Sequence, residues 1–321
     1  MKIFFKKSFF MKVSVIIPTL NAEKFIEGLL KNLIEVQTLK PDEIIVIDSS
    51  SQDKTVEIAK SYGCKTIVIK KEEFNHGGTR TFAGKKAIGD ILVYFTQDAY
   101  PYNEYALENL IKVFEKDEKI ACAYGRQIPY EDTNIYGKFM RHFNYPETSF
   151  IRTYEDRHKF GRKTVFFSNS FSAYKKEILE KVGWFKENLI SYEDIYIVAR
   201  FLTEGYKIAY VADAIVYHSH SLSVWKDFKR HFELGIFFRE ENWILKTFGK
   251  KPKDEGIRMI KEFIKFTKKK GEFSPISKFF FFYFLRRFAW VLGYNYKYLP
   301  KKITNYLITN KNWFIRHCKI I

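Results

Sequence analysis

The sequence has only three cysteines, Cys64, Cys122 and Cys318, and they lie far apart. An odd number of separated thiols gives neither a disulfide framework nor the paired spacing of a zinc site, so we expect a reducing, cytoplasmic setting. No apolar run reaches the roughly 18 residues that a membrane-spanning helix needs. Residues 1–10 lack the apolar core and the cleavage site of a signal peptide, so we expect no export by that route.

Acidic residues are scarce in the last third of the sequence. The whole chain has a formal net charge of +18, and the segment from Lys226 to the C-terminus holds 23 Lys and Arg against 8 Asp and Glu. That segment lacks the signatures of helix-turn-helix, zinc-finger and RNA-binding proteins, so we expect no nucleic-acid partner. Its basic residues instead alternate with Phe, Tyr and Trp, a pattern that favours an anionic membrane surface.

The sequence contains enough apolar residues to form a large hydrophobic core. The 321 residues are 46% apolar and 18% aromatic, which excludes a disordered chain. Apolar runs at Val13–Pro18, Glu43–Ile47 and Thr66–Ile69 alternate with segments of helical period. Such short β-α-β-α-β connections predict an α/β fold with a mostly parallel, doubly wound sheet flanked by helices. We predict an α/β domain over residues 11–225 and a basic helical region over residues 226–321.

The remaining elements are predicted from the same patterns. Further strands are expected at Ile91–Phe95, Ile120–Tyr124, Thr164–Ser170, Ile208–Val211 and Ile215–Tyr217. Residues Asn134–Lys163 are polar, aromatic and irregular, and we expect a long loop over a site. One helix is expected after Asn21, which suits an N-cap, and another from Thr81 to Ile88.

Two acids follow predicted strands. The buried run Ile91–Phe95 stops at Thr96-Gln97-Asp98. Ligands of open parallel sheets bind at the carboxyl ends of the strands, so Asp98 could hold a divalent metal against a diphosphate. Asp48, at the end of the second strand, could accept hydrogen bonds from a ribose or a base. The alternative for each is a structural role, with Asp98 capping the next turn and Asp48 forming one.

A glycine pair precedes the helix expected at Thr81. In the sequence Phe-Asn-His-Gly-Gly-Thr-Arg, Gly77 and its neighbour would let backbone N–H groups approach an anion, and Arg80 could pair with phosphate through two hydrogen bonds. The segment is not a Walker motif, because Gly-Lys-Ser/Thr is missing. The alternative is an ordinary loop-to-helix turn, which explains the glycines but not His76 and Arg80.

Two more pairs of polar residues are candidates. Glu193 and Asp194 precede an apolar helix, where the helix dipole alone would favour acids. His218 and His220 follow the last predicted strand and could ligate a metal, although histidines are also common on surfaces.

These segments together resemble the family-two nucleotide-sugar glycosyltransferases, which are inverting enzymes with the GT-A fold. The resemblance covers about two-thirds of the chain. Its segments are Val-Ser-Val-Ile-Ile-Pro-Thr-Leu-Asn from Val13, Val-Ile-Asp-Ser-Ser-Ser-Gln-Asp-Lys-Thr from Val46, Gly-Asp-Ile-Leu-Val-Tyr-Phe-Thr-Gln-Asp-Ala from Gly89, Lys-Lys-Glu-Ile-Leu-Glu-Lys-Val-Gly-Trp-Phe-Lys-Glu from Lys175, and Tyr-Glu-Asp from Tyr192. The His-Gly-Gly-Thr-Arg and Thr-Gln-Asp-Ala segments resemble the rhamnosyltransferase-like branch, which builds bacterial surface polysaccharides.

The resemblance implies roles for individual residues. Asp98 would bind Mg²⁺ or Mn²⁺, although the first acid of the family's Asp-x-Asp is Thr96 here, which leaves fewer charges for the metal. His218, or His220 in its place, would lie near the metal. Asp194 would be the general base, rather than its neighbour Glu193. The donor-binding set would be Pro18, Thr19, Asn21, Asp48 (nucleoside), Ser50, His76, Gly77, Arg80 (diphosphate), Gln97 and Asp98.

The resemblance also implies partners. The donor would be a nucleoside-diphosphate-sugar and the acceptor a lipid-linked molecule or a glycan. We expect Ile276–Tyr294 to lie in the interface of the cytoplasmic leaflet, with the protein peripheral at the inner face of the cell membrane. The alternative is that this aromatic segment packs on the catalytic domain or on a second subunit of a homo-oligomer.

Two other functions compete with glycosyl transfer. A sugar-1-phosphate nucleotidylyltransferase is also α/β and metal-dependent, but its glycine-rich motif would follow the first strand, whereas Gly77 follows the third. A non-catalytic membrane scaffold could keep the fold, but retention of both Asp98 and Asp194 is evidence against it.

Overall fold

The structure is a computed structural model, and it describes residues 11–219, 223–249, 255–269 and 275–318. The strands are β1 (Val13–Thr19), β2 (Glu43–Asp48), β3 (Lys65–Val68), β4 (Ile91–Phe95), β5 (Tyr100–Pro101), β6 (Ile120–Ile128), β7 (Phe150–Arg152), β8 (Phe171–Lys175) and β9 (Lys207–Tyr217). The helices are α1 (Glu23–Lys31), α2 (Thr55–Ser61), α3 (His76–Lys86), α4 (Ala106–Lys112), α5 (Ile135–Asn144), α6 (Arg157–Phe160), α7 (Lys176–Val182), α8 (Glu193–Thr203), α9 (Val224–Glu240), α10 (Asn242–Phe248), α11 (Glu255–Lys269), α12 (Pro275–Tyr294), α13 (Lys301–Leu307) and α14 (Lys311–Cys318).

The strands form one mixed sheet in the order β3-β2-β1-β4-β8-β6-β9-β5, with β7 added beside β9. Strands β3, β2, β1 and β4 are mutually parallel, and β6 is parallel to β9. Strand β8 lies antiparallel between β4 and β6. The predicted α/β fold with a parallel-dominated sheet and flanking helices is confirmed. The parallel half brings the carboxyl ends of β1, β2 and β4 to one edge.

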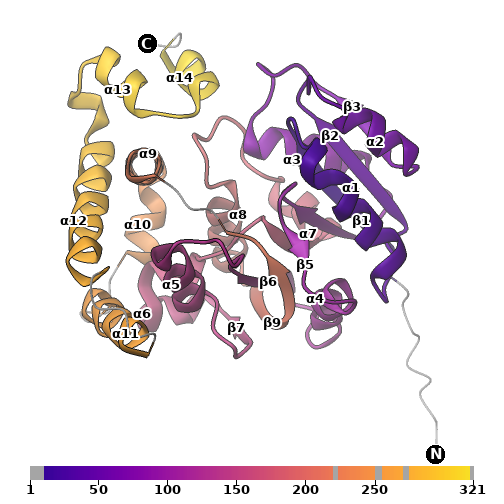
Figure 1. Cartoon of the computed structure of the whole chain (residues 1–321), viewed down its shortest axis with the longest axis horizontal. Coiled ribbons are helices and arrows are strands. Elements are labelled where there is room, and N and C mark those ends of the chain that lie inside the picture. The colour runs from indigo at the N-terminus through magenta and orange to yellow at the C-terminus, as the bar shows by residue number, and fades with distance from the viewer. Residues whose placement is uncertain (1–10, 220–222, 250–254, 270–274, 319–321) are drawn as a thin grey trace, which may run out of the picture.

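Alternate residues of the central strands belong to two separate cores. In β4, Leu92 and Tyr94 pack in one apolar cluster, while Ile91, Val93 and Phe95 pack in the other. Successive side chains of a strand point to opposite faces, so an uninterrupted apolar run is buried on both sides only when helices cover both faces of the sheet. Figure 1 shows these flanking helices.

Three local predictions are wrong. The strand expected at Thr164–Ser170 is a 3₁₀ turn over Gly161–Val165, and β8 begins only at Phe171. Its β-prone residues are buried by packing against the core and do not pair with another strand. The long loop expected at Asn134–Lys163 contains α5, β7 and α6 instead. Asn134 caps the start of α5 by accepting a hydrogen bond from the amide of Gly137 (2.9 Å). The two late strands are one strand, β9, with a register shift opposite Gly125/Arg126.

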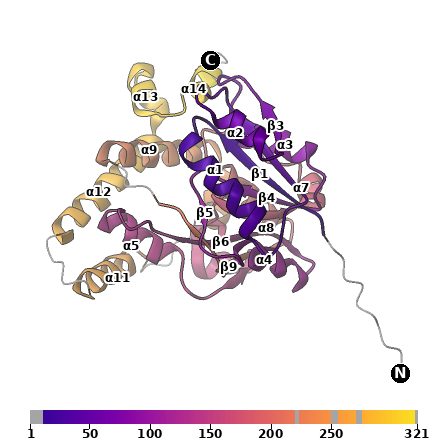
Figure 2. The same ribbon diagram turned by 45° about the vertical axis from the view of Figure 1, so that its right-hand side comes forward.

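The C-terminal helices form a layer beside the sheet. Helices α9 and α10 contribute to the larger apolar cluster, and α12 packs along α9 (Figures 1 and 2). The chain then returns toward the N-terminal half, since Asn312 of α14 donates a hydrogen bond to the Lys71 carbonyl (3.0 Å) and Arg316 donates one to the Glu72 carbonyl (2.6 Å). None of the helices among the described residues is both long enough and apolar enough to cross a bilayer.

Candidate functional site

Side chains tie the ends of β1, β2 and β4 together. Thr19, at the end of β1, donates to a carboxylate oxygen of Asp48, at the end of β2 (2.8 Å). Gln97, just after β4, accepts a hydrogen bond from the amide of Leu20 (2.9 Å). The structure therefore gathers three of the predicted binding segments at one edge of the sheet, as the parallel strand order requires.

Asp48 is fully buried and bonded within the protein. Besides Thr19, it accepts hydrogen bonds from the amide of Ser51 (2.7 Å) and from its hydroxyl (2.5 Å). The carboxylate thus shapes the loop after β2. Ser50 in this loop has a φ of 61° and donates to the Ile69 carbonyl (2.8 Å). Contact between Asp48 and a nucleoside stays a prediction.

Asn21 links β1 to α1 but does not cap the helix. The expected N-cap is wrong, because α1 begins at Glu23 after Ala22, and Asn21 has a left-handed φ of 49°. Its side-chain oxygen accepts a hydrogen bond from the amide of Gln52 (2.9 Å), which joins the first two loops of the rim. Pro18 does not end β1 but lies within it, half-buried and opposite Ile47.

Asp98 and His218 lie next to each other. Strand β5 pairs with the end of β9 at Tyr217, and this pairing brings Nε2 of His218 to 3.5 Å from a carboxylate oxygen of Asp98. On the other side of the ring, Nδ1 of His218 lies 2.9 Å from the amide oxygen of Gln127, whose NH₂ group donates to Ser168 (2.9 Å). Gln127 therefore accepts a hydrogen bond from Nδ1–H and orients Nε2 toward Asp98, as a lone pair in the neutral ring or as a donor in the protonated one.

This pair suits a divalent cation. A nitrogen lone pair that faces a carboxylate oxygen is favourable only with a cation or a proton between them. Mn²⁺ can be coordinated by both carboxylate oxygen and imidazole nitrogen, and Mg²⁺ by carboxylate oxygen. Within the described residues, which omit His220, no three His, Cys, Asp or Glu side chains gather. A metal held by Asp98 and His218 would complete its coordination with water and diphosphate oxygens.

Glu193 and Asp194 begin α8 after Tyr192, which has a left-handed φ of 68°. Glu193 is buried, 3.2 Å from Nη1 of Arg80, and accepts a hydrogen bond from the side chain of Asn169 (2.9 Å). Asp194 is only half-buried and accepts hydrogen bonds from the amides of Ile195 (2.8 Å) and Asn169 (3.3 Å). Asn169 thus holds both acids at once, one with its side chain and one with its backbone.

The two acids differ in proton affinity. Burial opposes ionisation of Glu193, but the charges of Arg80 and His76 and the hydrogen bond from Asn169 together outweigh it and lower the pKa of Glu193. Burial, and then the negative charge of Glu193, raise the pKa of Asp194 to about 7. Asp194 therefore gains and loses its proton near neutral pH, which is where a general base works best.

Arg80, His76 and Gly77 lie on the first turns of α3, which begins five residues before the predicted start. Arg80 is 5% exposed and donates to the His76 carbonyl (3.0 Å) besides pairing with Glu193. Its Nε atom is buried and has no hydrogen-bond partner among the described residues. A Cβ added at Gly77 would overlap the Lys186 carbonyl, so close packing accounts for this glycine. Burial lowers the pKa of the His76 imidazole.

Two residues of this site were missed from the sequence. Asn169 and Gln127 orient Glu193, Asp194 and His218 through side-chain bonds that only the folded chain shows. Asn169 lies in the polar Ser-Asn-Ser segment that follows an apolar run, and this position was the feature of the sequence that could have indicated it as a site residue. Gln127 lies within a strand, where nothing in the pattern distinguishes it.

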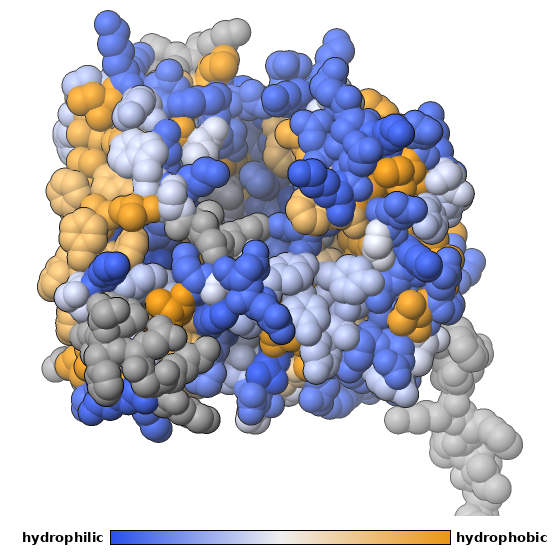
Figure 3. Space-filling model, viewed as in Figure 1, coloured by the Kyte–Doolittle hydropathy of each residue, from blue (hydrophilic) through white to orange (hydrophobic). Residues whose placement is uncertain are grey.

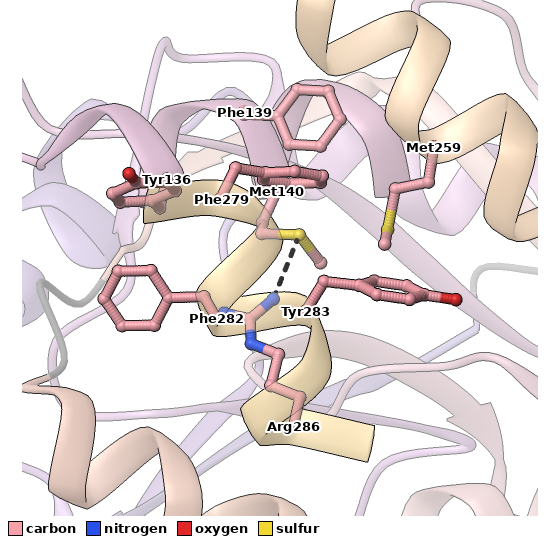
Figure 4. Close-up of a pocket in the computed structure, with 8 residues that line it drawn as sticks. All are labelled: Tyr136, Phe139, Met140, Met259, Phe279, Phe282, Tyr283 and Arg286. Atoms are coloured by element: carbon pink, nitrogen blue, oxygen red, sulfur yellow. Dashed lines mark hydrogen bonds between the residues drawn. The ribbon is translucent and has the colours of Figure 1, made fainter. Parts of the chain in front are cut away.

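The surface is hollowed between the two halves of the molecule. Figure 3 shows a recess between the C-terminal helices and the half that carries α1 to α3, with hydrophilic residues along its walls. A separate small pocket lies between α5, α11 and α12, and Figure 4 shows it. It is lined by Tyr136, Phe139, Met140, Met259, Phe279, Phe282, Tyr283 and Arg286. No predicted site residue lines this pocket.

Solved structures share the fold. A mannosyltransferase from Pyrobaculum calidifontis, in complex with GDP-Man and Mn²⁺, matches with a TM-score of 0.55 and 19% identity over 72% of this chain and 64% of that one. Residues 1–349 of TarS from S. aureus match with a TM-score of 0.55 and 18% identity over 93% of this chain and 83% of that one. At these identities the likeness concerns the fold alone, and it confirms the expected GT-A architecture.

Sequence comparisons give the family. The model of glycosyl transferase family 2 matches residues 14–183, and that of glycosyl transferase family group 2 matches residues 102–314. The O-antigen chain rhamnosyltransferase RfbN of Salmonella typhimurium is 37% identical over 95% of this chain and 96% of its own length. The O-antigen chain rhamnosyltransferase WbaN of Salmonella anatum is 38% identical over 94% of this chain and 95% of its own length. With a family model across more than half of its length and two such relatives, the chain belongs to glycosyl transferase family 2 and is a glycosyltransferase.

Proposed function

We propose that this glycosyltransferase moves rhamnose or a similar sugar, with inversion, from a nucleoside-diphosphate-sugar to a hydroxyl of a lipid-linked or polysaccharide acceptor. The observation that carries the proposal is the arrangement of Asp194, which is half-buried beside the buried Glu193–Arg80 pair. The sugar is proposed from the two relatives named as rhamnosyltransferases.

Asp194 acts as the general base in this proposal. The acceptor oxygen forms a bond to the anomeric carbon while the bond from that carbon to the diphosphate oxygen breaks, and the acceptor proton passes to Asp194. Glu193 remains ionised beside Arg80, and its negative charge increases the affinity of Asp194 for that proton. Attack from the face opposite the leaving group inverts the configuration.

The departing diphosphate gains negative charge that must be balanced. Mg²⁺ or Mn²⁺, held by Asp98 and His218 with His220 as an alternative ligand, would supply that balance when bound. Gln127 orients the His218 ring for this role. The Mn²⁺ in the complex of the related-fold mannosyltransferase supports a divalent metal. We propose as donor-binding residues Pro18, Thr19, Asn21, Asp48, Ser50, His76, Gly77, Arg80, Gln97 and Asp98.

The protein acts at the cytoplasmic face of the cell membrane in this proposal, as a peripheral enzyme. The O-antigen relatives support an acceptor of the surface-polysaccharide class. Residues 11–225 would carry the catalytic machinery, and residues 226–321 would bring it to the acceptor. A homo-oligomer remains an alternative use of the C-terminal region.

Substitution of Asp194 tests the assignment. Asp194→Asn keeps the shape but cannot take a proton, so kcat should fall by about 10²–10⁴-fold while donor affinity is kept. The assay measures nucleoside-diphosphate release with nucleoside-diphosphate-rhamnose and a lipid-linked acceptor, and NMR of the product gives its anomeric configuration.

Asp213→Asn is the matched control, since this exposed acid in the middle of β9 is not among the proposed site residues and should leave kcat unchanged. Normal turnover by Asp194→Asn would contradict the base assignment. Pyrophosphate release by the wild type would point to a nucleotidylyltransferase, and release of neither product would point to a scaffold.

A further inference from the structure

Helix α12 exposes an apolar row. The side chains of Phe281, Phe284, Phe288 and Val291 are 59%, 65%, 59% and 40% exposed, respectively. Their spacing of three and four residues places them on one stripe of the helix. In Figure 3 hydrophobic residues gather along the left edge, where Figure 1 shows α12. A surface helix ordinarily turns its polar stripe outward, so this row is an unsatisfied apolar face.

The packing of the inner face keeps this row outward. A Cβ at Gly293 of α12 would overlap the Phe232 carbonyl of α9, and one at Gly235 of α9 would overlap the Trp290 carbonyl. The two helices therefore touch backbone to backbone at these glycines. Arg286 adds a two-pronged ion pair with Asp227 of α9, with N···O distances of 2.6 and 3.2 Å.

Figure 4 shows side chains on the inner face of α12. Phe282, Tyr283 and Arg286 point from α12 toward the pocket that α5 and α11 complete. Rotation of α12 to bury its outer row would break the glycine contacts, the ion pair and this aromatic lining together.

The row lies in a basic region, and four acids of the C-terminal helices are engaged with other groups of the protein. Asp227 pairs with Arg286, Glu240 with Lys297, and Glu241 with Lys186. Glu233 accepts hydrogen bonds from Thr309 and from the amide of Asn310. Exposed cations on α12 and the neighbouring helices α11 and α13 are Lys278, Arg287, Arg258, Lys261, Lys265, Lys268, Lys301 and Lys302. Among the described side chains of α11, α12 and α13, the exposed charged ones are therefore all cations.

We propose that this face of α12, consisting of Phe281, Phe284, Phe288 and Val291 with the flanking Lys278 and Arg287, docks on an anionic lipid bilayer. The helix lies in the plane of the interface, its aromatic rings enter the boundary between headgroups and acyl chains, and the cations contact lipid phosphates. The inference deepens the proposed function, on which it rests for a membrane-held acceptor.

Charge favours lipid over a second copy of the chain. A symmetric dimer through this row would bring Lys278 and Arg287 of both copies to the same interface, and the described side chains of α11, α12 and α13 include no exposed acid to balance them. An anionic headgroup surface supplies the missing negative charge.

Vesicle flotation of the full-length protein tests the proposal. Wild type should float with vesicles of phosphatidylcholine and phosphatidylglycerol, and much less with phosphatidylcholine alone. The variant Phe281→Ser/Phe284→Ser/Phe288→Ser should lose at least ten-fold in vesicle-bound fraction. Lys278→Gln/Arg287→Gln should bind the anionic vesicles more weakly and with less dependence on salt.

The matched control is Phe25→Ser/Val36→Ser/Ile88→Ser, which removes three side chains that are 47%, 48% and 57% exposed outside the C-terminal region. It should float as wild type does. Equal flotation of all variants, or no flotation of wild type, overturns the proposal. A change from dimer to monomer in the Phe triple variant, measured by analytical ultracentrifugation, would assign the row to a second copy and overturn it as well.

Two readouts separate this result from the proposed function. The Phe triple variant should keep its melting temperature, because its side chains are exposed, and the single variant Phe284→Ser provides a milder test if the triple variant melts early. With an acceptor dispersed in detergent, nucleoside-diphosphate release should match wild type. If the wild type itself released no nucleoside diphosphate, the proposed function would be rejected, whereas the flotation result would still stand.

Discussion

The pKa values of the two neighbouring acids at the start of α8 are shifted in opposite directions, although the acids are adjacent in the sequence. Glu193 is 4% exposed beside Arg80, and Asp194 faces partly outward beside that negative charge. A buried carboxylate next to a guanidinium stays ionised, whereas a second carboxylate nearby holds its proton more strongly. The resemblance named Asp194 as the base, and the structure adds the physical reason why this acid has a raised pKa.

The rate of transfer should depend on pH through Asp194. Its pKa is raised to about 7, and a base works only when deprotonated, so kcat should rise as pH increases through about 7 and level off above it. Glu193→Gln removes the neighbouring negative charge, which lowers the pKa of Asp194 and moves the rise to lower pH. Measurement of kcat from pH 5 to pH 9 at saturating donor checks both expectations.

The control for this pH profile is Glu204→Gln, which removes an exposed acid near the other end of α8. It should leave the midpoint where it is in the wild type. If Glu193→Gln has the wild-type midpoint and is still folded, the electrostatic coupling between the two acids is wrong.

At the scale of elements, the contact between α9 and α12 depends on two glycines that the sequence did not single out. Gly235 and Gly293 each lie against a backbone carbonyl of the other helix. Glycine is unfavourable in a helix interior by about 1 kcal/mol relative to alanine, so close approach is the reason for glycine here. The aromatic run that we expected at Ile276–Tyr294 therefore has one face against α9 and another face exposed.

Gly293→Ala should destabilise the protein. The added methyl group would overlap the Phe232 carbonyl and push α12 away from α9, which should lower the free energy of unfolding by about 1–3 kcal/mol despite the better helix propensity of alanine. Urea denaturation measures the change. Val291→Ala, at an exposed position two residues before Gly293, is the control and should change stability by less than about 0.5 kcal/mol. A Gly293→Ala protein as stable as wild type would contradict the tight helix contact.

At the scale of the whole molecule, the proposed site takes its groups from remote parts of the chain. Asp98 follows β4, His218 follows β9, Arg80 lies in α3 and Asp194 in α8. A ligand that binds only the folded state raises stability by RT ln(1 + [L]/Kd), which is about 2.7 kcal/mol at 100 times its Kd. Donor binding should therefore be visible as a rise in melting temperature.

A thermal-shift screen of nucleoside-diphosphate-sugars should give a rise of several degrees for the true donor, larger with Mn²⁺ than with EDTA. Asp98→Asn should remove the Mn²⁺-dependent part, because the metal loses its carboxylate ligand. Asp132→Asn, an exposed acid, is the control and should keep it. A rise that is equal with Mn²⁺ and EDTA would contradict a metal at Asp98 and His218.

The sequence by itself determined the parallel half of the sheet, the family, and the segments that carry the candidate site. Each of these depends on local patterns, namely apolar runs buried on both faces, short connections, and acids directly after strands. It did not determine the antiparallel insertion of β8, the helix α5 within an expected loop, or the continuity of β9. Those features depend on which distant segment offers a partner, and burial of Val165 and Phe167 requires only apolar neighbours, not a paired strand.

Only the tertiary structure decided how the site residues act on one another. Asn169 holds Glu193 and Asp194, Gln127 orients His218, and Arg80 pairs with Glu193, at sequence separations from 24 to 91 for the hydrogen bonds and more than 100 for the ion pair. A proton affinity depends on burial and on charges a few ångströms away, and local sequence does not contain those distances. For the same reason the exposed row of α12 became visible only when the packing of its other face against α9 was known.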